Sequence, residues 1–140
     1  MNSIILLLIS FVSFGYCAPM EELIKAEVAP VLGGWNTLPL DSKKVMQMAK
    51  LLQNSYNKKN SSRYWSKITE VEEALMQVAN WINYQFTVII EPTGCLKEEN
   101  LETCKTPGFE HMMVEKCHYF IRQNPSKFKL TIIGKTCEEV

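Results

Sequence analysis

The sequence, 140 residues long, lacks several features from which function is often predicted. It has no glycine-rich phosphate loop, no internal repeat and no C-x-x-C pair, and its only histidines, His111 and His118, are not spaced to pair with a nucleophile. Basic and acidic residues number 15 each, so no basic surplus marks a surface for nucleic acid or an anionic membrane. We therefore expect that the protein is not an enzyme, needs no cofactor, and binds neither nucleic acid nor a membrane.

Charge is also absent from the first part of the chain, where no charged residue precedes Glu21. Residues 4–9 form an apolar run that is too short to span a bilayer and is typical of a secretory signal peptide, although a buried N-terminal helix would look similar. We expect a signal peptide at 1–18, cut after Cys17 or Ala18. No later apolar run is long enough to span a bilayer, so we expect a secreted, extracellular protein with one domain at 19–140.

Four of the five cysteines remain after the expected cleavage edge: Cys95, Cys104, Cys117 and Cys137. An even number in a secreted chain predicts two disulfides, and four cysteines allow three pairings. A zinc site that includes the two histidines is the competing interpretation. The lack of a C-x-x-C spacing and the oxidising compartment disfavour it, so no metal is expected.

The first half of the domain contains a proline-rich segment and then a helix. Residues 19–40 hold three prolines and a Gly-Gly pair, which predicts an extended, flexible arm. Asp41 or Ser42 can cap a helix whose apolar residues recur at three and four up to Tyr56. Asn60 opens an N-glycosylation sequon on the loop that follows. Residues 64–77 also follow helical spacing, so periodicity alone predicts a second helix there.

The second half alternates as strands do. Apolar residues recur at every second position from Ile82 to Ile90, before a break at 92–94. A polar, disulfide-tied segment at 95–113 is followed by alternating strands at 117–121 and 128–132, with a turn at 124–126 between them. One helix followed by antiparallel strands indicates an α+β fold with the helix packed on one face of the sheet.

Several of these features, in this order, resemble the type 2 cystatins, which are secreted inhibitors of papain-like cysteine proteases. They are the Val31-Leu32-Gly33-Gly34 segment, the helix end SYNKK with the tyrosine beyond it, the Ile82-Asn83-Tyr84 step, and cysteine separations of nine and 20 residues. The resemblance covers nearly the whole domain. It implies the cystatin fold, one long helix on a curved antiparallel sheet, with disulfides between sequence neighbours. It also implies a strand, not a helix, at 64–77.

The resemblance further implies an inhibitory wedge made of three segments that fill a protease cleft without offering a bond to cut. The family forms it from the arm before a hinge glycine, a first hairpin loop Q-x-V-x-G and a second hairpin loop Pro-Trp. The matching positions in this sequence are Val31, Leu32 and Gly33, then Gln77, Val78, Ala79, Asn80 and Trp81, then Pro125 and Ser126. Papain-like proteases of the cathepsin type are the implied partners of a monomer, with a dimer that exchanges first hairpins as the alternative.

Three of these positions depart from the family pattern, because Ala79, Trp81 and Ser126 stand where valine, glycine and tryptophan are expected. Glycine in such a turn supplies a positive φ, so we expect the left-handed residue of the loop to shift to Asn80. Trp81 is then either a displaced wedge residue or a structural residue packed beside Tyr84 or Phe128. The first predicts a protease inhibitor, and the second a secreted cystatin-fold binding protein that has lost inhibition.

Overall fold

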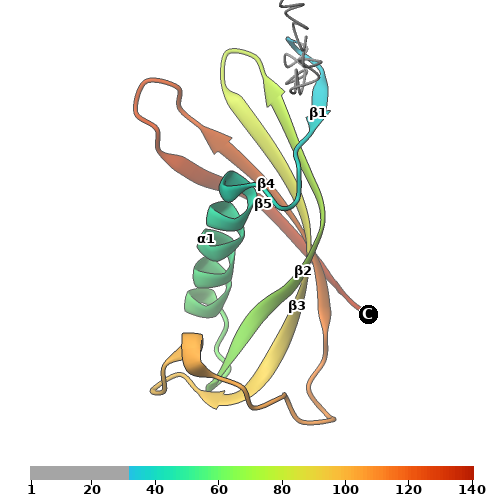
Figure 1. Ribbon diagram of the computed structural model, residues 1–140, viewed down its shortest axis with the longest axis vertical. Coiled ribbons are helices and arrows are strands. Elements are labelled where there is room, and N and C mark those ends of the chain that lie inside the picture. The colour runs from blue at the N-terminus through green and yellow to red at the C-terminus, as the bar shows by residue number, and fades with distance from the viewer. Residues whose placement is uncertain (1–31) are drawn as a thin grey trace, which may run out of the picture.

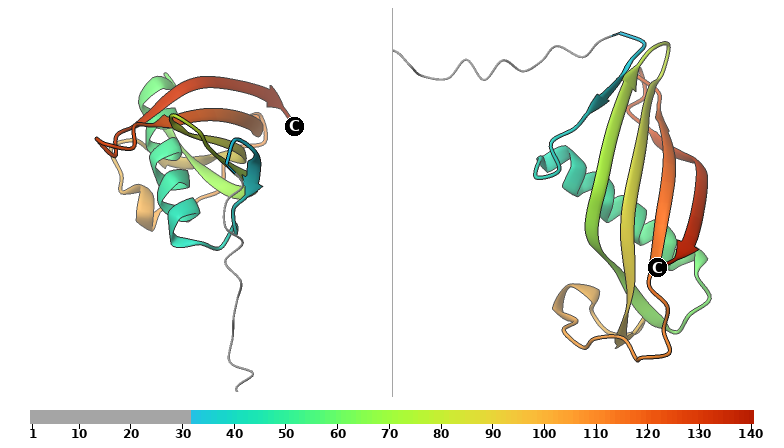
Figure 2. Two further views of the ribbon diagram at one scale, coloured as in Figure 1. Left: turned by 90° about the horizontal axis from the view of Figure 1, so that it is seen from above. Right: turned by 90° about the vertical axis from the view of Figure 1, so that its right-hand side faces the viewer.

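A computed structural model describes residues 32–140, so Val31, the expected signal peptide and most of the expected arm lie outside the described residues. The elements are β1 (Trp35–Thr37), α1 (Lys43–Lys59), β2 (Tyr64–Val78), β3 (Ile82–Leu96), a 3-10 turn η1 (Leu101–Thr103), β4 (Glu115–Gln123) and β5 (Leu130–Glu139). The strands form one antiparallel sheet in the order β1-β2-β3-β4-β5. Helix α1 crosses one face of this curved sheet (Figure 1, Figure 2).

The core lies between α1 and the concave face of the sheet. Val45, Met48, Leu52 and Tyr56, which recur at three and four along α1, are buried. They pack on alternate residues of the central strands: Tyr84, Phe86, Val88 and Ile90 of β3, and Cys117, Tyr119 and Ile121 of β4. The predicted α+β class, the helix and the inward face of residues 82–90 are therefore confirmed.

Both ends of α1 are held by side chains. The amide of Val45 donates to the hydroxyl of Ser42, which caps the first turn. At the other end, the Lys97 ammonium donates to the carbonyls of Asn57 and Asn60, both at 2.7 Å. A cation at these free carbonyls also complements the helix dipole. These contacts stabilise the end of the helix just before β2.

The disulfides join sequence neighbours, as the resemblance implied. Cys95 is bonded to Cys104, which ties the segment after β3 back to that strand. Cys117 is bonded to Cys137, which joins β4 to the edge strand β5. Since all four sulfur atoms are oxidised, none is a thiolate that could hold zinc.

Four expectations about local structure need correction or completion. Residues 64–78 form a strand, so the helix that periodicity predicted is wrong and the resemblance was right. The predicted break at 92–94 does not end β3, which continues to Leu96. Pro92 is tolerated there because β3 pairs with β4 only as far as Ile90, so the amide that proline lacks is not needed for that pairing. Residues 35–37 pair with β2, so this part of the expected arm is a strand. Strand β5 begins at Leu130, and Phe128 lies in the preceding turn.

Candidate functional site

The hinge and the two hairpin loops lie at the same end of the sheet. Val78 pairs with Ile82 across the first hairpin, Ile82 pairs with Gln123, and Gln123 pairs with Leu130 across the second hairpin. The Gly33 amide donates to the carbonyl of Val78 at 2.9 Å. The hinge, the first loop (residues 79–81) and the second loop (residues 124–129) therefore form one edge, called here the loop edge (Figure 1).

Glycine is required at position 33 because its φ is +81°, in the left-handed region that side chains disfavour. A Cβ atom there would meet nothing within 4 Å, so the requirement comes from the backbone and not from packing. Gln77 fixes the hinge to the first hairpin: its amide nitrogen donates to the Gly33 carbonyl at 3.1 Å, and its amide oxygen accepts from Asn83 at 3.1 Å. Leu32 is 81% exposed just before this fixed point.

The first loop closes without a left-handed residue. The Ala79 amide donates to the Trp81 carbonyl at 3.0 Å, and Phe128 is the only non-glycine residue with a positive φ within residues 32–140. The expectation that Asn80 takes the left-handed conformation is therefore wrong. Because position 81 does not need a positive φ either, tryptophan is tolerated where glycine was expected.

Trp81 lies at the loop edge and not in the core. Its side chain is 41% exposed, and the Arg122 guanidinium lies 5.7 Å from its ring centre. With Asn80 it lines a cleft of about 340 Å³ whose other wall is Asn124, Pro125 and Ser126 of the second loop. The alternative placement beside Tyr84 does not hold, because Tyr84 is buried under the helix, where Lys44 lies over its ring.

The second loop is organised by Asn124. Its side-chain oxygen accepts from the amide of Ser126 at 2.9 Å and from the Ser126 hydroxyl at 2.7 Å. Its carbonyl accepts from the amide of Phe128, whose φ of 51° turns the chain into β5. Phe128 is 77% exposed as a result. The sequence analysis missed this aromatic side chain, because its spacing from Leu130 and Ile132 is that of a strand.

Within residues 32–140, the titratable groups with large pKa shifts lie away from the loop edge. The large pKa shifts in the described part of the chain lie under the helix, where burial first and then Glu115 raise the pKa of Tyr56 and of Tyr119. His118 contacts Thr87 at 3.0 Å, and His111 stacks on Phe109. Within residues 32–140, the one grouping with metal-ligating atoms is Glu115, Cys117 and Cys137, and its sulfurs are in a disulfide. The described part of the loop edge presents shape and apolar surface.

The glycosylation candidate lies away from the loop edge, just after α1. Asn60 is half-buried, and its side-chain oxygen accepts from the Ser62 amide at 2.9 Å. Within the described residues, no helix has the length and apolar character needed to cross a membrane.

One helix on a five-stranded antiparallel sheet, with two disulfides and three segments gathered at one edge, defines an α+β protein with the fold that the resemblance implied. A family model for the cystatin domain matches residues 33–126. The chain belongs to the cystatin family, a family of protease inhibitors and not of enzymes, which confirms the resemblance.

Individual relatives agree with this assignment. Cystatin-C of Oryctolagus cuniculus is 27% identical over 77% of this chain and 74% of its own length. The crystal structure of Al-CPI superimposes with a TM-score of 0.67, at 22% identity, over 77% of this chain and all of that one. The crystal structure of dimeric human cystatin F gives a TM-score of 0.65, at 18% identity, over 86% of this chain and 97% of that one. The two structural likenesses support the fold alone.

Proposed function

We propose that the protein is a reversible, tight-binding inhibitor of papain-like cysteine proteases of the cathepsin type. The observation that carries the proposal is the gathering of Leu32–Gly33, the first loop and the second loop at one edge of a rigid sheet. The hydrogen bonds of Gly33 to Val78 and Gln77 hold the hinge in line with the first loop. An edge that is ordered before binding loses little entropy when it enters a cleft.

Two exposed aromatic side chains are the proposed anchors of this edge. Ser126 stands where the family has tryptophan, and such a loss costs about 2 kcal/mol, or roughly thirtyfold in affinity. Trp81 lines the cleft next to Pro125 and Ser126, where it can restore apolar contact area. Phe128, at the far side of the second loop, adds a second ring that is open to a partner.

The experiment is a titration of papain and of a lysosomal cathepsin with the oxidised protein that expressing cells secrete. We expect tight, reversible inhibition that weakens about tenfold or more in Trp81→Gly and in Phe128→Ala, because each removes an anchor. Ser126→Trp should strengthen inhibition. Phe109→Ala is the matched control, because Phe109 is also an exposed aromatic residue but contacts Tyr64 at the other end of the sheet.

The outcomes are distinct. Equal weakening by Phe109→Ala would mean that loss of folding, and not loss of an anchor, explains the result. No inhibition by the native protein would contradict the proposal. The intact mass of the same secreted protein tests the proposed leader at 1–18, the mature domain at 19–140 and a glycan on Asn60. Gel filtration tests the proposed monomer.

A second function has one observation in its favour. Arg122 lies over the Trp81 ring, and the Ser126 hydroxyl is hydrogen-bonded to Asn124. The side chains of Trp81 and Ser126 therefore already have contacts within the chain. A secreted cystatin-fold binding protein without protease inhibition would fit that arrangement. Absence of inhibition by the native protein, with recovery in a Trp81→Gly, Ser126→Trp variant, would favour this second function.

A further inference from the structure

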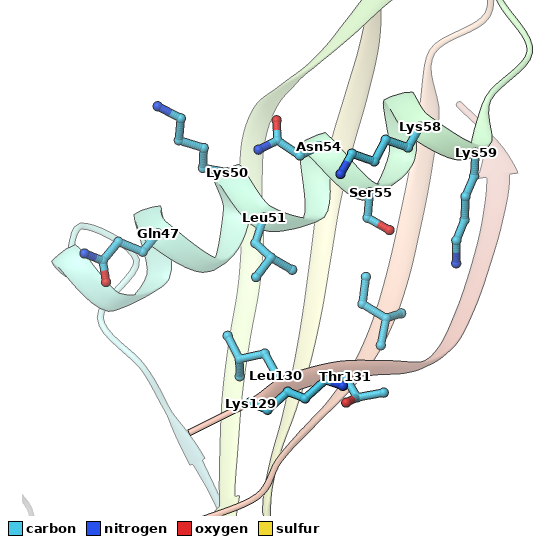
Figure 3. A pocket seen from close by; sticks show the side chains of 11 residues that line it. Gln47, Lys50, Leu51, Asn54, Ser55, Lys58, Lys59, Lys129, Leu130 and Thr131 are labelled. Atoms are coloured by element: carbon cyan, nitrogen blue, oxygen red, sulfur yellow. The ribbon is translucent and has the colours of Figure 1, made fainter. Parts of the chain in front are cut away.

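A groove of about 740 Å³ runs between α1 and the first half of β5, away from the first loop. Figure 3 shows Leu51 of α1 and Leu130 of β5 pointing toward each other across it. Leu51 is 37% exposed, and Leu130 and Ile132 are only partly buried against the core. The floor of the groove is therefore apolar and open to solvent.

Lysine side chains surround this floor. Lys50, Lys58 and Lys59 of α1 and Lys129 of the second loop line the groove, and no carboxylate does. Lys50 is paired with Glu102 at 2.8 Å and points away from the groove, whereas Lys59 extends toward β5 (Figure 3). The two ion pairs found within residues 32–140 leave Lys58, Lys59 and Lys129 without an acidic partner.

The two segments of the chain that contribute the groove residues are basic. Residues 43–59 contain five lysines and residues 124–135 contain three, and neither segment contains an aspartate or a glutamate. These two segments thus hold eight of the 15 basic residues and none of the 15 acidic residues of a chain whose net charge is zero. Partial burial is the main cause that lowers the pKa of Lys135, while the charge of Glu115 opposes the shift and that of Lys59 adds a smaller lowering.

We propose that this groove docks an acidic, leucine-bearing peptide segment of a partner protein. Carboxylates of the segment would neutralise Lys58, Lys59 and Lys129, and its leucines would cover Leu51, Leu130 and Ile132. The apolar floor favours a peptide over a sulfated polysaccharide, which has no side chains to bury there. The groove shares Lys129 with the second loop but contains none of the proposed inhibitory anchors, so the inference does not depend on protease inhibition.

The test uses the full mature protein and a fluorescein-labelled peptide in which leucines recur at three and four with glutamates between them. Fluorescence anisotropy should report saturable binding that weakens as salt is added. Lys58→Gln with Lys59→Gln should weaken it at least tenfold, and so should Leu51→Ser. The matched control, Arg63→Gln with Lys105→Gln, changes net charge equally outside the groove and should leave binding unchanged. Circular dichroism and urea unfolding check that each variant is folded.

Three outcomes would overturn the proposal. The first is no binding of the peptide, or equal weakening by the control pair. The second is binding of heparin that Leu51→Ser does not change, together with no peptide binding, which would assign the groove to a polysaccharide. The third is peptide binding only after Glu21→Lys, Glu22→Lys and Glu27→Lys, which would mean that the acidic arm of this same chain holds the groove.

Discussion

At the scale of single residues, two buried tyrosines differ in a way that can be measured. Tyr84 and Tyr119 are both 1% exposed on the concave face of the sheet. The Tyr84 hydroxyl donates to Gln123 at 2.8 Å, whereas the Tyr119 hydroxyl has no hydrogen-bond partner among the described residues. A buried polar group without a partner costs free energy that removing it recovers.

We expect Tyr119→Phe to leave the free energy of unfolding at neutral pH unchanged or to raise it by up to about 1 kcal/mol. Tyr84→Phe, the matched control, should lower it by about 1 kcal/mol, because it removes a bond and leaves the Gln123 oxygen unpaired. Urea unfolding of the three proteins measures both effects. A loss of similar size in the two variants would mean that Tyr119 also has a partner.

The raised pKa of Tyr119 predicts that the folded protein loses stability at alkaline pH. Burial, and then the charge of Glu115, raises the pKa of Tyr119 to about 12, whereas a tyrosine in the unfolded chain ionises near about 10. Between these values the folded protein holds a proton that the unfolded chain has released, so the free energy of unfolding falls as pH rises. Tyr119→Phe should show a smaller fall between about pH 10 and about pH 12 than the native protein.

Residue-scale prediction from the sequence failed where a loop has several solutions. Gly33 was singled out only through the family resemblance, and the structure adds that its φ is positive. The left-handed residue of the first loop was not found at Asn80, because the loop closes through the bond from Ala79 to Trp81. The exposure of Phe128 could not be predicted, since it depends on the bonds that Asn124 makes.

At the scale of elements, one asparagine joins α1 to β2. Asn57 is buried near the end of the helix, its amide nitrogen donates to the Ser66 carbonyl at 2.8 Å, and its amide oxygen accepts from the Ser66 amide at 2.8 Å. These two bonds replace a backbone pair and set the position of the helix on the sheet. Without them, two buried groups of the Ser66 backbone would have no partner.

We expect Asn57→Ala to lower the free energy of unfolding by about 3 kcal/mol, since each unpaired buried group costs about 1 to 3 kcal/mol. Asn54→Ala is the control on the exposed side of the same helix, where alanine should be neutral or stabilise by a few tenths of a kcal/mol. Chemical unfolding of both variants provides the comparison. Equal effects would show that helix propensity, and not the contact with Ser66, decides the result.

Strand β2 shows why spacing alone gave the wrong element. Its register against β3 shifts between Ile68 and Glu70 and again between Val71 and Glu73. Each shift adds one residue, so Ile68, Val71 and Ala74, which pack toward the helix, are three residues apart instead of two. Two bulges thus give a strand the spacing of a helix, and only the order of motifs along the chain predicted it correctly.

At the scale of the whole molecule, the two candidate binding sites, the loop edge and the lysine-lined groove, lie in different places. The loop edge gathers the hinge and both hairpin loops at one end of the sheet, while the lysine-lined groove lies between α1 and the start of β5. Composition alone could not predict the groove, because a net charge of zero hides the separation of eight basic residues from the acidic ones. The separation becomes visible only when α1 and the second hairpin are placed together.

A disulfide joins the two strands of the second hairpin at the end away from its loop. Strand β5 is an edge strand whose last residues are exposed, and Cys137 near its end is bonded to Cys117 in the buried part of β4. Removing a crosslink that closes a separation of 20 residues costs about 3 kcal/mol through the entropy of the unfolded chain. We expect Cys117→Ala with Cys137→Ala to lower the free energy of unfolding by about this amount.

Hydrogen exchange can separate the effect of the Cys117–Cys137 disulfide from that of the Cys95–Cys104 disulfide, because each should protect a different segment. Hydrogen exchange should quicken along Lys135–Glu139 in the Cys117, Cys137 variant, because little buried area holds those residues. In a Cys95→Ala, Cys104→Ala variant, exchange should quicken in the segment around η1 and leave β5 protected. Protection of β5 in both variants would mean that its ladder to β4 holds the end of the strand without the crosslink.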